Sequence, residues 1–204
     1  RDTYHLCSCC PPNITRLIAS MDMYIYSIFE NSLVVDQYIS SEFIFKDQGM
    51  KINQTSDFPH KGYSKIEIIE SNNNESSIYF RIPSWDKNMQ ISLNGIQTGY
   101  EVINGYAKIT KIWQKGEIID LYFDFSPRLV RSNPKVRNNI RKVCLFRGPI
   151  LYCLEENDNG KYLNKFVIDA DNSFDEVNDK ISSENIISLN TKGYKFEDTN
   201  DLYL

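Results

Sequence analysis

The sequence lacks an apolar run of membrane-spanning length, and it lacks an excess of either charge. A bilayer span needs about 20 consecutive apolar residues, and the longest apolar runs here fall far short of that. The 23 basic and 27 acidic residues are interspersed and leave a net charge of -4. An evenly mixed surface argues against binding to nucleic acid or to an anionic membrane. We therefore expect neither among the partners.

The sequence also lacks the features of a secreted disulfide scaffold. It begins with Arg1 and has no charged segment followed by an apolar one, so no signal peptide is visible. Five cysteines are an odd and small number for 204 residues, whereas disulfide frameworks are short and cysteine-dense. Cys144 and Cys153 lie in apolar, strand-like runs, where a free thiol is most often part of the core. The expected location is a reducing compartment, the cytoplasm.

Helical periodicity is scarce, and the N-terminal half contains one convincing helix, over residues 11–21. Its apolar residues recur at spacings that form one helical face. Proline is tolerated in the first turn, because its missing N–H would be unpaired there in any case. A helix this short needs packing partners, and the chain supplies few helical ones. The apolar residues are Ile14, Leu17, Ile18 and Met21.

From residue 23 onward the pattern has a period of two, which is typical of strands. The strand-like stretches follow one another at short intervals, with turn signals between them. One of these is Asn94-Gly95, a preferred dipeptide of tight hairpins. This succession predicts an antiparallel sandwich. The predicted strands cover residues 23–29, 33–40, 42–46, 50–55, 65–70, 77–82, 89–93, 107–112 and 118–125.

The last third of the sequence gives weaker signals. Residues 126–141 are basic and polar, and we favour a solvated connection between two sheets over a basic binding patch. Residues 156–186 lose their periodicity and are predicted to be irregular. Two strong strands are joined through Arg147-Gly148, and two weak ones follow late in the chain. These four strands cover residues 142–146, 149–155, 186–189 and 193–196.

The strongest chemical signal is Cys7-Ser8-Cys9-Cys10-Pro11-Pro12-Asn13. Thiols at the beginning of a helix lie near the positive end of its dipole, which favours the thiolate. The thiolate is the form that attacks electrophiles and binds zinc. From these residues alone, a pair of buried thiols or half of a structural zinc site is an equally good interpretation of Cys9 and Cys10.

Further motifs follow the cysteine stretch in a fixed order. Each later motif is weak singly, and the ordered series is specific. The series is Arg16-Leu17-Ile18-Ala19-Ser20, Asp57-Phe58-Pro59, Arg81-Ile82-Pro83-Ser84-Trp85, Leu93-Asn94-Gly95, Gly105-Tyr106, Trp113 with Lys115-Gly116-Glu117, and Arg147-Gly148-Pro149-Ile150-Leu151-Tyr152-Cys153-Leu154-Glu155. Together with the cysteine stretch, it resembles the beta-L-arabinofuranosidase family, glycoside hydrolase family 127 and its relatives.

The resemblance implies an architecture in which an N-terminal (α/α)6 barrel holds the active site and β-sandwich domains follow it. Residues 1–22 would then be the end of the barrel with its last helix. Residues 23–130 would form one β-sandwich, and residues 131–204 a second, partial one. The implied chain is a mainly β fragment, antiparallel β-sandwich domains preceded by one helix, with sequence missing at both ends.

The resemblance also implies a role for the adjacent cysteines. In the family, the first of the pair is the nucleophile of a retaining glycosidase, and both bind zinc with a glutamate and a cysteine from an upstream segment. Transferred by motif, Cys9 is the nucleophile, and Cys9 and Cys10 are zinc ligands. The implied substrate is a plant-type arabinofuranoside oligosaccharide bound by the missing barrel, which also supplies the acid/base glutamate. A second copy of the chain, bound through the β-sandwich in a homodimer, is a further candidate partner.

Several residues have a structural interpretation beside the functional one. Cys7 and His5 are more simply structural than active-site groups, and His60 is expected on the surface in a turn. Trp85 and Trp113 follow strand ends and either stack sugars, as in carbohydrate-binding modules, or cover the sandwich edge, which we favour.

Arg147 is more simply an ion-pair partner at a strand end than a substrate clamp. For the whole chain, one alternative function is a carbohydrate-binding or purely structural β-sandwich without catalytic activity. Another is that the parent glycosidase acts on a different sugar.

Overall fold

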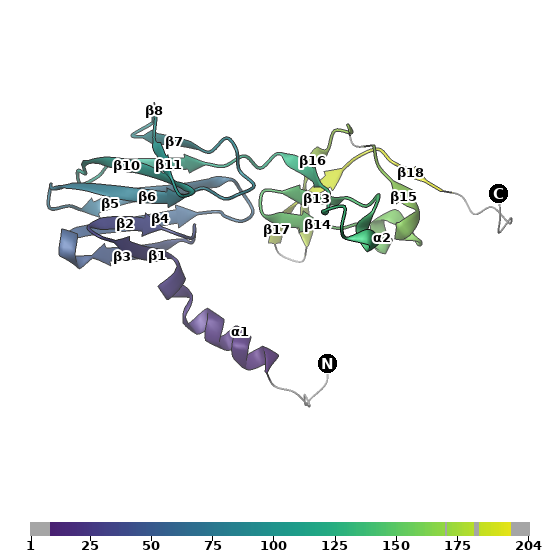
Figure 1. Cartoon of the computed structure of the whole chain (residues 1–204), viewed down its shortest axis with the longest axis horizontal. Coiled ribbons are helices and arrows are strands. Elements are labelled where there is room, and N and C mark those ends of the chain that lie inside the picture. The colour runs from purple at the N-terminus through teal and green to yellow at the C-terminus, as the bar shows by residue number, and fades with distance from the viewer. Residues whose placement is uncertain (1–8, 170, 182–183, 197–204) are drawn as a thin grey trace. The chain divides into compact units, whose positions relative to one another are not determined.

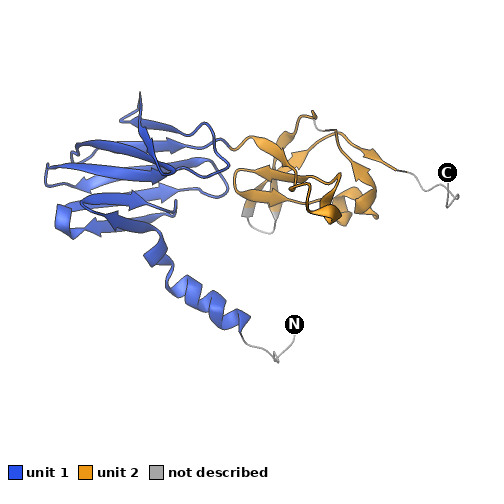
Figure 2. Ribbon diagram, in the orientation of Figure 1, with its two compact units in different colours: residues 1–124 blue, residues 125–204 orange. Residues whose placement is uncertain are grey.

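The computed structural model describes residues 9–169, 171–181 and 184–196. Within them strands predominate (Figure 1), and the α-helices are α1 (Cys10–Ala19) and α2 (Glu156–Asn159). The prediction of a mainly β, antiparallel fold is confirmed. The chain divides into two compact units, residues 1–124 and 125–204 (Figure 2), whereas the sequence-based division lay at residue 130.

Helix α1 begins with Cys9 as its N-cap and has Pro11 and Pro12 in its first turn. It ends at Ala19, and a 3-10 turn, Met21–Tyr24, follows it. No residue of α1 is buried, and Ile14, Leu17 and Ile18 on its apolar face are exposed. This is what the sequence predicted for a short helix with few helical partners in the chain. None of the described helices is long and apolar enough to span a bilayer.

The first unit contains a five-stranded sheet in the order β1-β2-β6-β10-β9 and a six-stranded sheet in the order β3-β4-β5-β11-β7-β8. Strand β2 pairs with β6 in parallel, and the other registers are antiparallel. The strands are β1 (Tyr26–Phe29), β2 (Ser32–Val35), β3 (Ser41–Phe45), β4 (Met50–Ser56), β5 (Tyr63–Glu70), β6 (Glu75–Arg81), β7 (Gln90–Leu93), β8 (Ile96–Thr98), β9 (Glu101–Ile103), β10 (Tyr106–Ile112) and β11 (Ile118–Tyr122).

The core of this unit comes from the alternating apolar side chains that the sequence pattern marks. Ile66 and Ile68 of β5, and Ile78 and Phe80 of β6, are fully buried. Each such side chain stabilises the fold by about 1.5–3 kcal/mol relative to leaving it in water. Trp113 is fully buried as well, and its Nε1 donates to the carbonyl oxygen of Ser76 at 3.1 Å. The structural interpretation of Trp113 is therefore confirmed.

Two hairpins of the first unit turn on Asn-Gly dipeptides. Asn94 and Gly95 have φ values of 51° and 80°, the left-handed pair that a type I′ turn requires, so the predicted hairpin is confirmed. Asn104 and Gly105, with φ values of 50° and 85°, form the same kind of turn between β9 and β10. Strands β8 and β9 were not predicted, because each has three residues, too few for alternation to stand out.

The second unit contains a three-stranded sheet in the order β12-β13-β14 and two two-stranded sheets. The predictions of a solvated connection over 126–141 and of irregular structure over 156–186 are wrong in part, since strands form in both. Strand β16 has the sequence DEVNDKI, with four charged residues, and pairs with β17 through backbone hydrogen bonds. Because it does not bury one face, its sequence lacks the alternating apolar pattern from which a strand is predicted. The strands are β12 (Pro127–Val130), β13 (Cys144–Arg147), β14 (Ile150–Tyr152), β15 (Phe166–Val167), β16 (Asp175–Ile181), β17 (Glu184–Asn190) and β18 (Tyr194–Lys195).

The prediction that Cys144 and Cys153 belong to the core is wrong, because both thiols are free and exposed. Cys144 pairs with Val130 across the ladder, so the two side chains lie on one face of the three-stranded sheet. Val130 is exposed too, as is Leu151 of β14. The apolar sequence around Cys144 therefore forms a strand, but among the described residues no second layer covers this face of the three-stranded sheet.

Candidate functional site

The candidate site is the exposed cysteine pair at the beginning of α1. Cys9 has helical dihedral angles, φ -64° and ψ -36°, and its carbonyl oxygen accepts the N–H of Asn13 at 3.2 Å. Cys10 is the first residue of the helix. The two Sγ atoms are 3.8 Å apart, too far for a disulfide, whose S–S bond is about 2.05 Å. Both thiols are therefore outside any disulfide and exposed at the positive end of the helix dipole.

The residues after the pair fix its backbone. The hydroxyl of Thr15 donates to the carbonyl oxygen of Pro11 at 2.9 Å. The guanidinium of Arg16 donates to Oδ1 of Asn13 at 3.0 Å, one helical turn away. Because proline has no N–H, Pro11 and Pro12 leave the first turn with fewer backbone donors for a thiolate. A thiolate here would therefore receive fewer backbone hydrogen bonds than at a helix start without prolines.

The spacing of the two sulfurs fits one metal ion. Two thiolates bound to one tetrahedral zinc at about 2.3 Å lie about 3.8 Å apart, which matches the 3.8 Å between the two Sγ atoms. No group of three or more His, Cys, Asp or Glu side chains that could hold a metal occurs among the described residues. Cys7 and His5 lie outside those residues. The 3.8 Å spacing of the two sulfurs is thus compatible with two of the four positions of a tetrahedral site.

Trp85 and His60 lie away from the cysteine pair in the chain, in loops of the first unit. Trp85 is half-buried and stacks on Phe58, with ring centroids 6.4 Å apart and planes at 24°. Phe58 in turn contacts Tyr38 and Phe123. Trp85 therefore belongs to an aromatic cluster, as its structural interpretation predicts. His60 is exposed in a turn, which confirms its expected surface position.

Asp86, beside Trp85, is a buried carboxyl group. Burial raises its pKa, although the backbone N–H groups of Asn88 and Asp124 donate to it at 2.8 and 3.1 Å. A carboxyl group held by backbone donors on both oxygens fixes loop geometry. It is not positioned to transfer a proton to a ligand.

Arg147 is buried in the second unit and makes an ion pair with Glu176 of β16, with 2.9 Å between Nη2 and Oε2. Its guanidinium also lies over the ring of Phe125, 5.4 Å from the centroid. The prediction of an ion-pair partner at a strand end is confirmed. Arg147 joins β13 to β16 within this unit.

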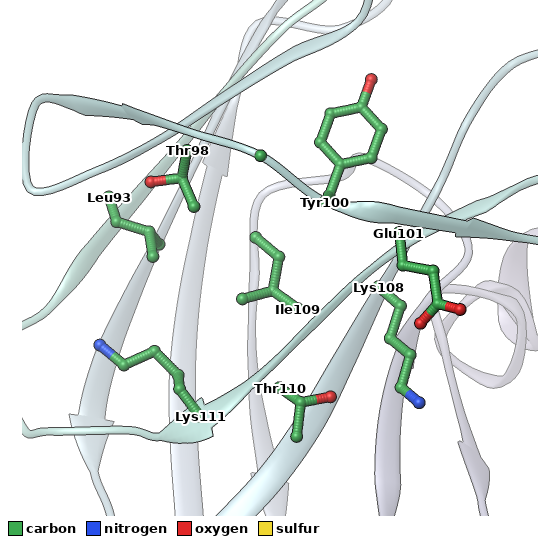
Figure 3. Close-up of a pocket in the computed structure, with 9 residues that line it drawn as sticks. Leu93, Thr98, Tyr100, Glu101, Lys108, Ile109, Thr110 and Lys111 are labelled. Carbon is green, nitrogen blue, oxygen red and sulfur yellow. The ribbon is translucent and has the colours of Figure 1, made fainter.

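The first unit has a surface hollow of about 470 Å³ that the sequence did not single out. Figure 3 shows its side chains around Ile109, from β10 and from the segment around Thr98 and Tyr100. Lys111 pairs with Glu117, and Lys108 lies over the ring of Tyr79. The lining residues include one carboxylate and no cysteine or histidine, whereas glycoside hydrolysis needs two catalytic groups. The hollow therefore does not form a catalytic site of that kind by itself.

The comparisons with known proteins bear on the sequence and the fold together. Residues 32–125 match the family described as "Beta-L-arabinofuranosidase, GH127 middle domain", and residues 127–193 match "Glycoside hydrolase family 127 C-terminal domain". A "Non-reducing end beta-L-arabinofuranosidase" of Bifidobacterium longum subsp. longum is 33% identical over 161 residues, which are 75% of this chain and 24% of that protein.

Solved structures show the same likeness over nearly the whole chain. A GH127 beta-L-arabinofuranosidase from Geobacillus stearothermophilus T6 superposes with a TM-score of 0.90 at 30% identity, over 100% of this chain and 33% of that one. A structure described as a GH127 beta-arabinofuranosidase superposes with a TM-score of 0.85 at 27% identity, over 96% of this chain and 34% of that one.

The fold and the family matches together define the class of this protein, a pair of β-domains from a glycoside hydrolase family. The chain belongs to glycoside hydrolase family 127, and it contains the middle and C-terminal domains of that family. It spans about a quarter of the length of the curated relative and about a third of the solved ones.

Proposed function

We propose that this chain is the C-terminal part of a retaining beta-L-arabinofuranosidase in which Cys9 is the nucleophile. The family membership and the two relatives described as beta-L-arabinofuranosidases support the activity. The observation that carries the residue assignment is the exposed Cys9–Cys10 pair, with its sulfurs 3.8 Å apart at the beginning of α1. Most of the 204 residues are then the non-catalytic sandwich region of the enzyme.

Cys9 and Cys10 are the two zinc ligands that this chain contributes in the proposal. When bound, zinc keeps the two thiols deprotonated. The spacing of the sulfurs and the scarcity of backbone donors at Pro11 and Pro12 support a metal as the stabilising cation. The other two ligands come from outside these residues.

The proposed reaction begins when Sγ of Cys9 attacks the anomeric carbon of an L-arabinofuranoside. A C–S bond forms as the C–O bond to the leaving group breaks, and a general acid outside this chain protonates the leaving oxygen. Water then gives a proton to the same outside group, now a general base, attacks the anomeric carbon and releases the sugar with net retention, while the thiolate of Cys9 departs.

The exposed face of α1 is the second part of the proposal. Ile14, Leu17 and Ile18 are 59%, 52% and 66% exposed, and a short helix gains most of its stability by burying such a face. We assign α1 to the last helix of an (α/α)6 barrel that holds the arabinofuranoside oligosaccharide. A cytoplasmic location and a homodimer through the β-sandwich also remain proposals, and neither nucleic acid nor membrane is among the proposed partners.

The 204-residue chain by itself is expected to be inactive and to bind zinc weakly. Two thiolates supply half of a tetrahedral site, and the proposal places the acid/base group outside this chain. Hydrolysis of an aryl β-L-arabinofuranoside should not exceed the buffer rate. In a competition titration with a chromophoric chelator, zinc affinity should fall further in Cys10→Ser and stay unchanged in Cys144→Ser. Turnover by the isolated chain would refute the proposed division of labour, and equal zinc affinity in both variants would refute the ligand assignment.

A second candidate function is a structural or carbohydrate-binding sandwich. The complete burial of Trp113 and the stacking of Trp85 on Phe58 favour the structural form, because Trp113 has no face open to a sugar and Trp85 belongs to an aromatic cluster. Calorimetric titration of arabinan oligosaccharides into the chain is therefore expected to show no saturable heat. Saturable binding that Trp85→Ala abolishes would establish a binding module instead. A parent enzyme for another sugar is the third candidate, distinguished by assaying a panel of aryl glycosides.

A further inference from the structure

The two exposed cysteines of the second unit flank one hairpin, since Cys144 begins β13 and Cys153 directly follows Tyr152, the last residue of β14. Strands β13 and β14 pair Arg147 with Ile150, Phe146 with Leu151, and Leu145 with Tyr152. Strand β14 ends at Tyr152, and this register extended by one position would place Cys153 opposite Cys144. Both are free thiols and both are exposed.

This register suits a disulfide. Residues directly opposite in an antiparallel pair have Cα atoms about 4.5–5.5 Å apart and side chains on the same face. Disulfides form over Cα separations of about 4.4–6.8 Å, so either kind of opposite position lies within range. Consecutive residues such as Cys9 and Cys10 have Cα atoms only about 3.8 Å apart, below that range.

Contacts on both strands hold the hairpin in this register. Cys144 pairs with Val130 on its other side. The ion pair of Arg147 with Glu176 and the hydrogen bond from the Tyr152 hydroxyl to the carbonyl oxygen of Ile187, at 2.8 Å, tie the two strands to β16 and β17. A slip by one residue would turn Arg147 and Tyr152 to the other face and break both contacts. A fixed register would keep the two thiols near each other, which favours intramolecular reaction over attack by a third molecule.

We propose that Cys144 and Cys153 are a redox-sensitive pair that closes to an intramolecular disulfide on exposure to a small-molecule disulfide such as oxidised glutathione. One thiolate attacks a sulfur of the oxidant and releases one glutathione thiolate. The second cysteine thiolate attacks the resulting mixed disulfide and releases the second glutathione. The two cysteines lose two electrons and two protons, and the oxidant is reduced to two thiols. This inference does not depend on the proposed glycosidase function.

Closure would fasten β13 to β14 at the open end of the hairpin, opposite the turn at Gly148. Arg147 lies inside the closed loop and is the residue that joins this hairpin to β16. Oxidation would therefore stabilise this hairpin, because the cross-link restricts the unfolded chain. The first unit contains neither cysteine and would be unaffected.

Tryptic mapping of the folded 204-residue chain tests the pair, because Arg147 lies between the two cysteines. The chain is incubated with oxidised glutathione, free thiols are blocked with N-ethylmaleimide in acid, and digestion proceeds without reductant. Residues 143–147 and 148–161 should then emerge as one joined species, two hydrogens lighter than the separate thiol peptides. The protein that yields it should run as a monomer in non-reducing electrophoresis.

Cys153→Ser and Cys144→Ser are the matched variants, since both side chains are exposed and serine is tolerated there. Each should accumulate a glutathione adduct on the remaining cysteine of the pair, because no partner thiol displaces it. The proposal is overturned if the protein without substitutions accumulates glutathione adducts on both peptides and the two peptides are not joined. It is also overturned if both thiols stay free, if either cysteine joins a thiol of residues 7–10, or if the joined species comes from a covalent dimer.

Discussion

Replacing Cys9 by serine in the full-length enzyme is expected to lower kcat for an aryl β-L-arabinofuranoside by about 10⁴–10⁶-fold, the scale seen when a covalent nucleophile is removed. A serine hydroxyl has the size of the thiol but stays protonated, so it neither attacks the anomeric carbon nor holds a metal as a thiolate does. The measurement is steady-state hydrolysis of the two proteins at equal zinc content. KM should change much less than kcat.

Two further variants make this result specific to Cys9. Cys10→Ser is expected to lower zinc content first and activity in proportion, so that added zinc restores part of the rate. Cys144→Ser, which removes an exposed thiol of the second unit, should retain full activity. If Cys9→Ser keeps most of its turnover, the nucleophile is another group and the assignment fails.

Replacing Gly148 by alanine is expected to destabilise the second unit by about 2–5 kcal/mol. This is the sum of the cost of placing alanine in a left-handed backbone conformation and the cost of an overpacked contact. Gly148 has a φ of 53° at the β13–β14 turn, and a Cβ atom there would lie 2.7 Å from the ring of Phe125. That ring also lies under Arg147, so it has little room to move away. The measurement is hydrogen exchange of the β13 and β14 amides under increasing denaturant.

The Phe125→Ala background separates the two causes of this loss. Without the ring, Gly148→Ala should cost only its backbone part, about 1–2 kcal/mol, and the difference between the two backgrounds measures the clash. The fluorescence of Trp85 and Trp113, both in the first unit, should show an unchanged unfolding midpoint in all four proteins. Equal costs in the two backgrounds would contradict the contact with Phe125.

The sequence predicts the first unit better than the second, for a physical reason. Strands such as β5 and β6 bury one face fully, so selection of apolar residues at every second position leaves a readable pattern. Strand β16 is held by ladder hydrogen bonds with exposed, charged side chains, which leave no such pattern. The exposure of Cys144 was missed for a related reason, because apolar residues in a strand do not reveal whether a second layer covers them.

The sequence predicted where the cysteine pair lies, but it could not predict the full set of groups in the candidate site. The paired cysteines and the two prolines mark a helix start, and α1 begins at Cys10, one residue before the predicted start. The 3.8 Å between the sulfurs adds what no sequence pattern contains. In the proposal the remaining ligands and the acid/base group lie on other segments, and neither spacing nor periodicity in these 204 residues could identify them. The proposed pairing of Cys144 with Cys153 could be inferred only from the register of β13 and β14, which the sequence does not determine.

The central claim is that Cys9 bonds to the sugar during turnover, and trapping that bond tests it most directly. The full-length enzyme is quenched in acid during steady-state hydrolysis of an aryl β-L-arabinofuranoside, digested, and sequenced by mass spectrometry across the peptide that ends at Arg16. The account predicts one arabinosyl group on the sulfur of Cys9, absent from Cys9→Ser. An arabinosyl group on Cys10 or on a carboxylate, or an inverted sugar product without any adduct, would contradict it.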